Sequence, residues 1–230
     1  MGIYMNKLLI SAAVIAISSG AFAADLKPYI EGQLGYAKLN DVDTKTISDS
    51  IGDVRLTGKL NNRYDSDTTY GFEFGVKDVG IENFRIGASY SRAEFDFKSA
   101  GLTGTLSTDA GSTSISGTAS RSDLGSYAST LDAKINLYML NAYYDFKNSS
   151  ALTPFVGAGI GFADVKNTKD NEFAYSLSAG AKYNINNNLY LGAKGSYVRV
   201  NGPTIQVDGG DYGLEDVDLR KAEVLLGYQF

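Results

Sequence analysis

The feature that most constrains this chain is an alternation of apolar and polar side chains with a period of two residues, which is typical of β-strands with one apolar face. Around Phe72, every second side chain is apolar, and those between are charged, as at Glu73 and Lys77, or are glycine. A fifth of all residues are charged, yet none falls in an apolar row. The segments with this pattern are 30–36, 70–77, 84–91, 138–146, 155–162, 173–183, 189–197 and 221–230.

A charge that faces the lipid core costs about 2–4 kcal/mol, so contact with lipid would exclude charges from one face in this way. The pattern therefore predicts an all-β fold, a transmembrane antiparallel up-and-down β-barrel of about eight strands. Its connections alternate in length. Short turns near 78–80, 147–150 and 184–187 separate long polar segments at 39–67, 98–130 and 200–217. In bacterial outer-membrane barrels the long loops are extracellular and the short turns periplasmic.

Three connections qualify this picture. The one around 166–169 is short although it belongs on the outside, which weakens the strand count. Residues 54–60 could extend a hairpin above the membrane, so a barrel of about ten strands is the alternative. Residues 99–130 are dominated by Gly, Ser and Thr, a composition that buries little apolar surface. For this segment we expect a mobile loop.

The N-terminus has the three parts of a secretory signal peptide. Lys7 is followed by the apolar run 8–17 and by the Ala-x-Ala ending at Ala21 and Ala23. The apolar run is much shorter than the roughly 20 residues that a membrane-spanning helix needs. We expect cleavage after Ala23, which leaves residues 24–230 as one barrel domain exported to the outer membrane.

Composition narrows the function. The chain has no Cys and no His, which excludes disulfides, thiolate or imidazole metal sites and catalysis by a histidine base. The formal charge of −5 argues against nucleic acid as a partner. Acidic loop residues could bind calcium, but a solvated loop face is the simpler interpretation. They are Asp208, Asp211, Glu215 and Asp216. We expect no cofactor and no enzymatic activity.

The polar rows predict the interior. A barrel of about eight strands has room only for its own side chains, and buried charges are costly unless paired. We therefore expect a luminal network of both signs and a plugged lumen, with a narrow ion path as the alternative. Its members are Glu31, Glu73 and Glu223 with Lys77, Arg85, Lys182, Lys194 and Lys221.

Glycine and tyrosine have simple explanations in such a barrel. The string Gly157-x-Gly159-x-Gly161 is a weak nucleotide fingerprint, because no helix or acidic partner follows it; it is better explained as space for long luminal side chains. Tyrosines near the ends of the apolar rows are candidates for aromatic girdles at headgroup level, with ordinary strand composition as the alternative. They are Tyr36, Tyr90, Tyr138, Tyr144, Tyr183, Tyr197 and Tyr228.

The last nine residues, AEVLLGYQF, resemble the C-terminal signature of outer-membrane barrels. That resemblance implies that the barrel-assembly machinery recognises Val224, Leu226, Tyr228 and Phe230. The segments LNAYYDF at 140–146 and LTPFVGAGIG at 152–161, with Phe173-Ala174-Tyr175 after them, look like the opacity-type surface barrel family. This resemblance implies an eight-stranded barrel related to the OmpA transmembrane domain, in a family with adhesins and surface antigens among its members.

Three functions remain open. The first is a surface protein in the outer-membrane bilayer whose loops bind host or environmental ligands, as an adhesin or surface antigen, since rigid scaffolds often present functional loops. The second is a small porin or ion channel that uses the luminal charges. The third is a soluble lipocalin-like barrel, which would turn its apolar faces inward instead.

Overall fold

The computed structural model describes residues 27–166, 168, 171–207 and 210–230. The expected signal peptide, with Ala21 and Ala23, lies outside the described residues. In the part of the chain that is described, no helix has the length and apolar character needed to cross a membrane.

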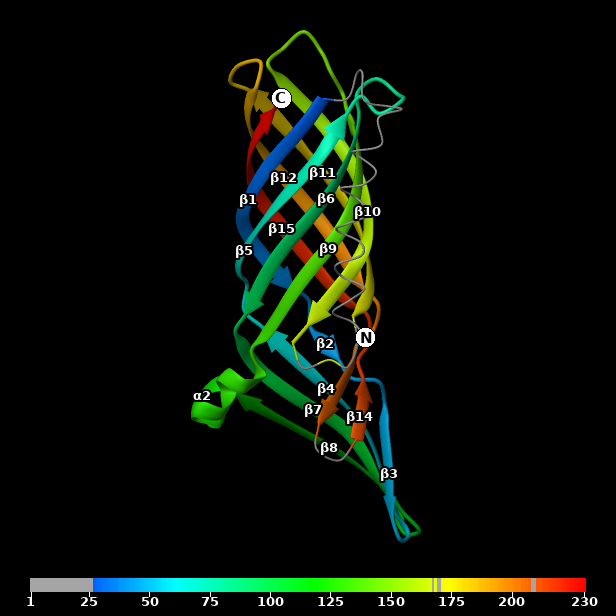
Figure 1. Ribbon diagram of the computed structural model, residues 1–230. Helices are drawn as coiled ribbons and strands as arrows, with labels where there is room; N and C mark the ends of the chain where they lie inside the picture. Colours follow the sequence, from blue (N-terminus) through cyan, green and yellow to red (C-terminus); the bar gives the residue numbers. More distant parts are fainter. Residues whose placement is uncertain (1–26, 167, 169–170, 208–209) are drawn as a thin grey trace.

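Eight antiparallel strands close into a barrel (Figure 1). Around the barrel the order is β1-β15-β12-β11-β10-β9-β6-β5, and β5 returns to β1. The fold class predicted from the sequence is therefore confirmed, and the barrel has eight strands rather than ten. The strands are β1 (Lys27–Leu39), β5 (Asp67–Lys77), β6 (Phe84–Phe95), β9 (Ala133–Asp145), β10 (Leu152–Val165), β11 (Glu172–Asn184), β12 (Leu189–Val200) and β15 (Val217–Gln229).

The two ends of the barrel differ. At the turn end, drawn at the top of Figure 1, the connections are 78–83, 146–151 and 185–188. At the loop end they are 40–66, 96–132, 166–171 and 201–216. The short connection after β10 thus belongs to the loop end, although residues 167 and 169–170 lie outside the described part of the chain.

A second sheet projects from the loop end and is called the extension here. In it β4 (Val54–Tyr64) pairs with β7 (Phe97–Thr108) from Arg55↔Ser107 to Tyr64↔Phe97. These strands continue β5 and β6, so one long ribbon runs from the barrel wall into the extension (Figure 1). The other strands are β2 (Val42–Asp43) and β3 (Ile47–Ile51) beside β4, and β8 (Gly111–Ser120) beside β7.

The expectation of a mobile loop at 99–130 is wrong. These residues form most of β7, all of β8, a short helix α2 (Arg121–Leu124) and a 3-10 helix η1 (Gly125–Leu131). The composition argument failed because the backbone of β7 is hydrogen-bonded on both sides, to β4 and to β8. The expected hairpin at 54–60 is part of the same sheet. A small hairpin of β13 (Thr204–Val207) and β14 (Gly210–Gly213) completes the loop end.

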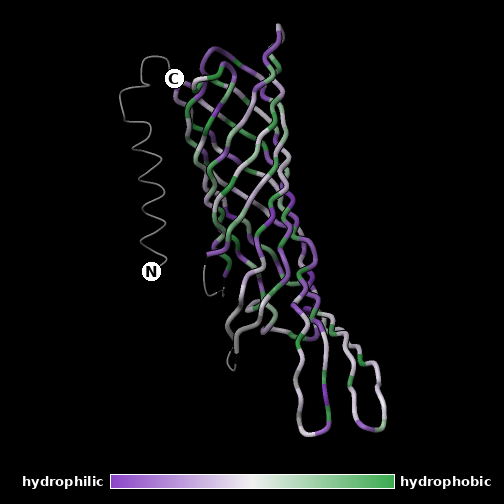
Figure 2. Tube along the Cα trace, turned by 90° about the vertical axis from the view of Figure 1, so that its right-hand side faces the viewer, coloured by the Kyte–Doolittle hydropathy of each residue, from purple (hydrophilic) through white to green (hydrophobic). Residues whose placement is uncertain are grey.

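The barrel turns its apolar rows outward, and hydropathy alternates along its strands (Figure 2). Phe72, Leu140 and Val224 are 48%, 51% and 56% exposed, whereas Glu73 and Lys194 are 0% and 7% exposed. A soluble lipocalin-like barrel would show the reverse, so that alternative is excluded. The tyrosines named above lie at the two edges of the outward apolar band: Tyr36, Tyr90, Tyr138 and Tyr197 toward the loop end, and Tyr144, Tyr183 and Tyr228 toward the turn end.

Candidate functional site

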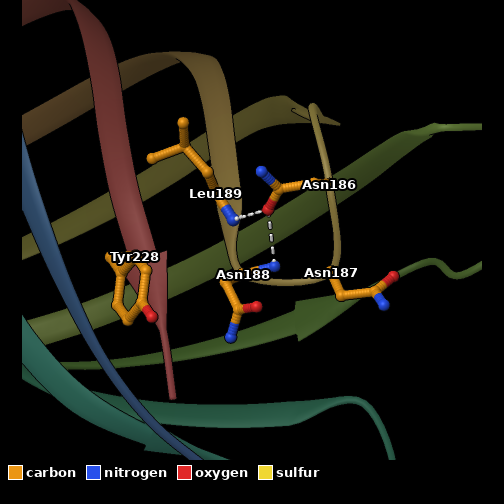
Figure 3. Close-up of a pocket in the computed structure, with 5 residues that line it drawn as sticks. All are labelled: Asn186, Asn187, Asn188, Leu189 and Tyr228. Atoms are coloured by element: carbon orange, nitrogen blue, oxygen red, sulfur yellow. Dashed lines mark hydrogen bonds between the residues drawn. The ribbon is translucent and has the colours of Figure 1, made fainter.

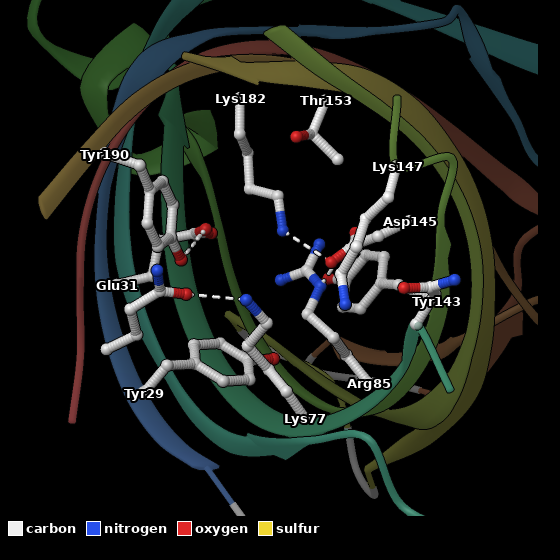
Figure 4. A network of polar contacts seen from close by, with 12 residues as sticks. Tyr29, Glu31, Lys77, Arg85, Tyr143, Asp145, Lys147, Thr153, Lys182 and Tyr190 are labelled. Carbon is white, nitrogen blue, oxygen red and sulfur yellow. Dashed lines mark hydrogen bonds and ion pairs between the residues drawn. The ribbon is translucent and has the colours of Figure 1, made fainter. Parts of the chain in front are cut away.

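The lumen near the turn end is filled by an ionic and aromatic cluster (Figure 4). Asp145 at the end of β9 accepts from Arg85 Nε at 3.1 Å and from Lys182 Nζ at 2.7 Å. The Arg85 guanidinium also lies over the Tyr143 ring, 4.4 Å from its centre. All four side chains are buried, and this arrangement pairs the carboxylate, which a buried charge requires.

Glu31 and Glu73 differ from the expected ion pairing. They face each other in the β1–β5 register, and among the described residues their hydrogen bonds come from neutral donors. Glu73 accepts from Tyr29 Oη at 2.6 Å, Tyr143 Oη at 2.7 Å and Asn141 Nδ2 at 2.9 Å. Glu31 accepts from Tyr190 Oη at 2.9 Å and from Gln33 Nε2 at 3.0 Å.

Glu223 lies between two lysines: Lys221, two residues before it on β15, and Lys194, its register partner on β12. Lys221 Nζ lies 3.0 Å from one carboxylate oxygen and Lys194 Nζ lies 3.6 Å from the other. Lys221 also donates to Ser91 Oγ at 3.1 Å, which ties β15 across the lumen to β6. Lys77, at the turn-end mouth, donates to Gln229 Oε1 at 2.5 Å. The eight charged residues named from the sequence therefore all point into the barrel: seven belong to three groups, and Lys77 lies apart at the mouth.

Asp145 and the hydroxyls of Tyr29, Tyr143 and Tyr190 were not among the residues predicted for this network. The signal that could have found Asp145 was present, because it follows Asn141 and Tyr143 at alternate positions on the polar row of β9. The contacts between strands carry no such signal, since Arg85 and Asp145, although on neighbouring strands, lie 60 positions apart in the sequence.

Luminal glycines make room for these large side chains. A Cβ at Gly157 would collide with the Tyr143 ring on the neighbouring strand, and one at Gly227 would collide with the Tyr190 ring. This supports the structural explanation of the Gly157-x-Gly159-x-Gly161 string, whose first two glycines lie against Tyr143 and Asn141.

Toward the loop end the luminal side chains become apolar. We call this cluster the plug. Its members are Ala37, Leu39, Val42, Ala93, Phe95, Ile135, Leu137, Met139, Ala163, Ala174, Val198, Val200, Leu214, Val217 and Leu219, all buried. Leu214 comes from the last long loop, where Thr44↔Leu214 forms an isolated bridge to the first. Both loops therefore fold over the lumen, which is charged in one half and apolar in the other.

The extension has two unlike faces. The β4–β7–β8 register places Leu56, Leu60, Leu102, Leu106 and Ile115 on the face that carries Tyr64, which packs against the plug. The opposite face carries Thr57, Lys59, Asn61, Arg63, Ser99, Thr103, Thr105, Ser107, Ser112, Ser114, Ser116 and Thr118. This hydroxyl face is hollowed by a depression of about 360 Å³, which is lined by side chains that include Asn61, Arg63, Thr103 and Thr118.

Ion pairs fasten the extension to the rim of the barrel. Lys59 Nζ lies 2.6 Å from Glu215 Oε1, and this hydrogen bond raises the pKa of Lys59. Asp132 accepts from the Phe97 amide at 2.9 Å and from Arg121 Nη1 at 2.9 Å. Partial burial raises the pKa of Asp132, but these hydrogen bonds outweigh it and hold that pKa below its usual value.

The acidic loop residues do not form a metal site where the structure describes them. Glu215 pairs with Lys59, and Asp216 accepts from the Gly202 amide at 3.0 Å. Asp208 lies outside the described residues, as does the side chain of Asp211. Among the residues that are described, no group of His, Cys, Asp or Glu could hold a metal ion.

A second hollow, of about 440 Å³, lies at the turn end beside the β11–β12 turn (Figure 3). Asn186 Oδ1 accepts from the amides of Asn188 and Leu189, which fixes the turn. Asn188 Nδ2 donates to the Gln229 carbonyl, and Gln229 Nε2 donates to the Asn187 carbonyl, both at 2.8 Å. The turn thus anchors the closing strand β15.

Charged rows inside and apolar rows outside a closed eight-stranded barrel decide the kind of protein, and comparison with known families agrees. The outer membrane protein beta-barrel domain model matches residues 9–230. The chain belongs to this family. It is therefore an outer-membrane barrel embedded in the lipid bilayer of a Gram-negative bacterium, which confirms the resemblance seen in the sequence.

Individual relatives match only in part. The outer membrane protein PagN of Salmonella typhimurium is 30% identical over 118 residues, 42% of this chain and 49% of that protein. An uncharacterized protein of Brucella abortus is 33% identical over 112 residues, 40% of this chain and 37% of that protein. The chain thus spans less than half of the length of each.

Solved structures support the fold. Neisserial surface protein A is 15% identical with a TM-score of 0.52, over 88% of this chain and 97% of that one. OprG from Pseudomonas aeruginosa is 14% identical with a TM-score of 0.51, over 89% of this chain and 95% of that one. At these identities the likeness concerns the fold alone.

Proposed function

We propose that this protein is a surface-exposed adhesive protein without enzymatic activity, in which the barrel is a scaffold and the extension binds a host or environmental surface. The observation that carries the proposal is the contrast between a lumen filled by its own side chains and an ordered sheet that projects from the loop end. Loops held by a rigid scaffold are favoured places for binding.

The hydroxyl face of the extension is the proposed contact surface. Its Ser and Thr hydroxyls, with the Asn61 amide, offer hydrogen-bond donors and acceptors, and its hollow gives a partner a concave surface to fill. The free edge of β8 adds to it. Residues 111–120 contain no charge and no proline, two devices with which edge strands usually discourage pairing with other chains.

The test removes the extension and keeps the barrel. Thr44 pairs with Leu60 by a backbone bond of 2.9 Å, so deletion of 46–59 joins chain ends that already lie together. Gly101 and Thr118 are register partners, so replacing 102–117 by Asn-Gly makes a short hairpin. We expect cells that display either variant to lose attachment to cultured epithelial monolayers, while the barrel remains folded and surface-exposed.

A matched control replaces the turn 148–150, which lies at the opposite end, and should leave attachment unchanged. Attachment that survives both deletions would overturn the proposal.

The channel alternative is tested separately. The Arg85–Asp145–Lys182 cluster and the plug both lie across the lumen, and apolar constrictions oppose ion passage. We expect no reproducible conductance from the purified, folded chain in planar bilayers. Steady single-channel steps that change when Lys182 is replaced by Gln would favour the channel instead.

We also propose that β15 is the strand recognised during assembly. It closes the barrel against β1, and Val224, Leu226 and Tyr228 all lie on its outward face. Phe230 follows them in the same alternation and is 70% exposed. Replacing Tyr228 and Phe230 together by Ser should slow insertion into the outer membrane in cells, with a smaller effect on spontaneous refolding in lipid vesicles.

A further inference from the structure

Two basic side chains lie next to each other on the outer wall of the barrel at its loop end. Lys38 on β1 and Arg220 on β15 are direct partners in the antiparallel register, and both are exposed. They occupy the outward row, one step beyond Tyr36 and Ala222. Directly opposed side chains have Cβ atoms about 4.5–5.5 Å apart, and like charges in that position destabilise the pair.

The other outward-facing cations on the barrel strands near the loop end are neutralised by the protein itself. Arg92 and Lys134 lie 2.6 and 3.2 Å from the Glu94 carboxylate, and Arg199 lies 2.7 Å from Asp218. Lys38 and Arg220 form no ion pair within 4.0 Å in the described part of the chain. Asp218 interacts electrostatically with Arg220, but both of its carboxylate oxygens accept from Arg199, so it compensates only part of the charge of the pair.

The position of Lys38 and Arg220 on the barrel indicates which group can neutralise their positive charge. It lies just past the outward apolar band, with Tyr36 below Lys38 and with Tyr197 as the register partner of Arg220. Outward tyrosines of this kind mark the level of lipid headgroups. Since the loop end is extracellular in this class of barrel, the two cations face the headgroups of the outer leaflet.

The outer wall of the barrel carries a row of small side chains on the membrane side of the two cations. In the register, Ala222 lies beside Gly195, and Gly195 lies beside Ala179. A Cβ added at Gly195 would meet nothing nearer than the Ala179 carbonyl oxygen at 3.9 Å, so the space outside it is open. Small side chains on three adjacent strands thus leave an apolar depression, in which an acyl chain can lie while its headgroup reaches Lys38 and Arg220.

We propose that Lys38 and Arg220 form a binding site for a phosphorylated lipid of the outer leaflet. The phosphate lies between the ammonium and the guanidinium, which neutralises both and removes their mutual repulsion. One acyl chain lies over Ala222 and Gly195. Arginine suits this role because its planar fork matches phosphate oxygens.

The test uses the full chain, refolded in phosphatidylcholine nanodiscs and titrated with a diphosphorylated, acylated glucosamine disaccharide. Native mass spectrometry measures the retained glycolipid, and heat-modifiable migration on gels checks that each variant is folded. Basic residues near an anionic membrane surface contribute about 1 kcal/mol each, so K38Q/R220Q should bind about thirty-fold more weakly than wild type. The matched control R92Q/K134Q also removes two positive charges from this level of the wall and should bind like wild type.

Two further arms identify the source of the phosphate and the role of the depression. The dephosphorylated glycolipid with the same acyl chains should bind wild type and K38Q/R220Q equally weakly. Ala222→Leu fills the depression and should weaken glycolipid binding. It should not change the NMR chemical shifts that the Lys38 and Arg220 amides show when inorganic phosphate is added. Equal retention of the glycolipid by wild type and K38Q/R220Q would overturn the proposal, and so would an affinity for inorganic phosphate equal to the affinity for the glycolipid.

Discussion

The ribbon of β5 and β6 and its continuation in β4 and β7 place their apolar side chains on opposite faces. Within the barrel, Phe72 points outward and Glu73 points into the lumen. In the extension, Leu60 and Leu102 share the face of Tyr64, which continues the luminal side, and the opposite face carries hydroxyls. One pair of strands therefore inverts its polarity where it leaves the membrane. The surrounding solvent, rather than strand propensity, decides which face is apolar.

The inversion needs a structural transition, and two features provide it. The register shifts at Arg63/Tyr64, where β7 has one extra residue, Lys98. Such a bulge moves the following side chains to the other face. The plug supplies the second feature, because it makes the luminal side apolar before the ribbon leaves the barrel, so the apolar surface continues from the plug to Leu60.

The largest difference between the two regions should appear when a carboxylate is removed. Glu223→Ala leaves Lys194 and Lys221 buried without their partner, which should cost about 3–5 kcal/mol of unfolding free energy. Glu215→Ala breaks an ion pair in the extension whose side chains are 45% and 47% exposed, and should cost about 0.2–1 kcal/mol. Urea unfolding in lipid vesicles measures both; equal costs would mean that water reaches Glu223 freely.

A charged substitution should distinguish an apolar face that contacts lipid from one that contacts water. Phe72 and Leu56 are similarly exposed, at 48% and 40%. Phe72→Arg should lower the unfolding free energy by about 2–4 kcal/mol, because it faces hydrocarbon. Leu56→Arg should change it by no more than about 0.5 kcal/mol. The same urea titration compares them, and a large cost at Leu56 would show that a partner covers this face.

Glycines test packing in the two regions. Gly157→Val forces a side chain into the Tyr143 ring and should destabilise the barrel by about 1–3 kcal/mol, the usual cost of overpacking. Gly117 in β8 has no atom within 4 Å of an added Cβ, so Gly117→Ala should stabilise the extension by about 0.5–1 kcal/mol. Hydrogen exchange of the β8 amides would report the second effect.

The smallest effect concerns the hydrogen bonds that Asp132 accepts at the rim, where the chain enters the extension. The pKa of Asp132 is lower when folded than when unfolded, because hydrogen bonds from Arg121 and Phe97 outweigh partial burial. Its stabilisation is present above the unfolded value of about 4 and is lost as the pH falls through the lower folded value. The protection of the Phe97 amide against hydrogen exchange, measured relative to its intrinsic rate at each pH, should therefore fall in that acidic range. Asp132→Asn should lower this protection at neutral pH and remove its pH dependence.

The sequence predicted the barrel well because lipid imposes a strict rule on every second residue. The rows through Phe72, Leu140 and Val224 contain no charge, so strand positions and their phase followed directly. The extension lacks that rule. Water tolerates both faces, and the sparse apolar residues Leu102, Leu106 and Ile115 show their common face only when β4 and β8 are aligned beside β7.

The luminal network was predictable in its members and not in its contacts. Period two places Glu31, Glu73 and Glu223 inside, but it does not say which carboxylate meets a cation. Glu223 lies between lysines on β12 and β15, whereas Glu73 meets Tyr29, Tyr143 and Asn141. Those partners depend on the stagger of strands around a closed barrel, which no linear pattern records.

The plug has a consequence for the cell that carries this protein. The lumen is filled by side chains of the barrel wall and by two loops that fold over it, so each copy of the protein closes its own barrel. A lumen closed in this way predicts that dense display of the protein adds no leak to the outer membrane. Overproduction should then leave the entry of small hydrophilic antibiotics into the cell unchanged.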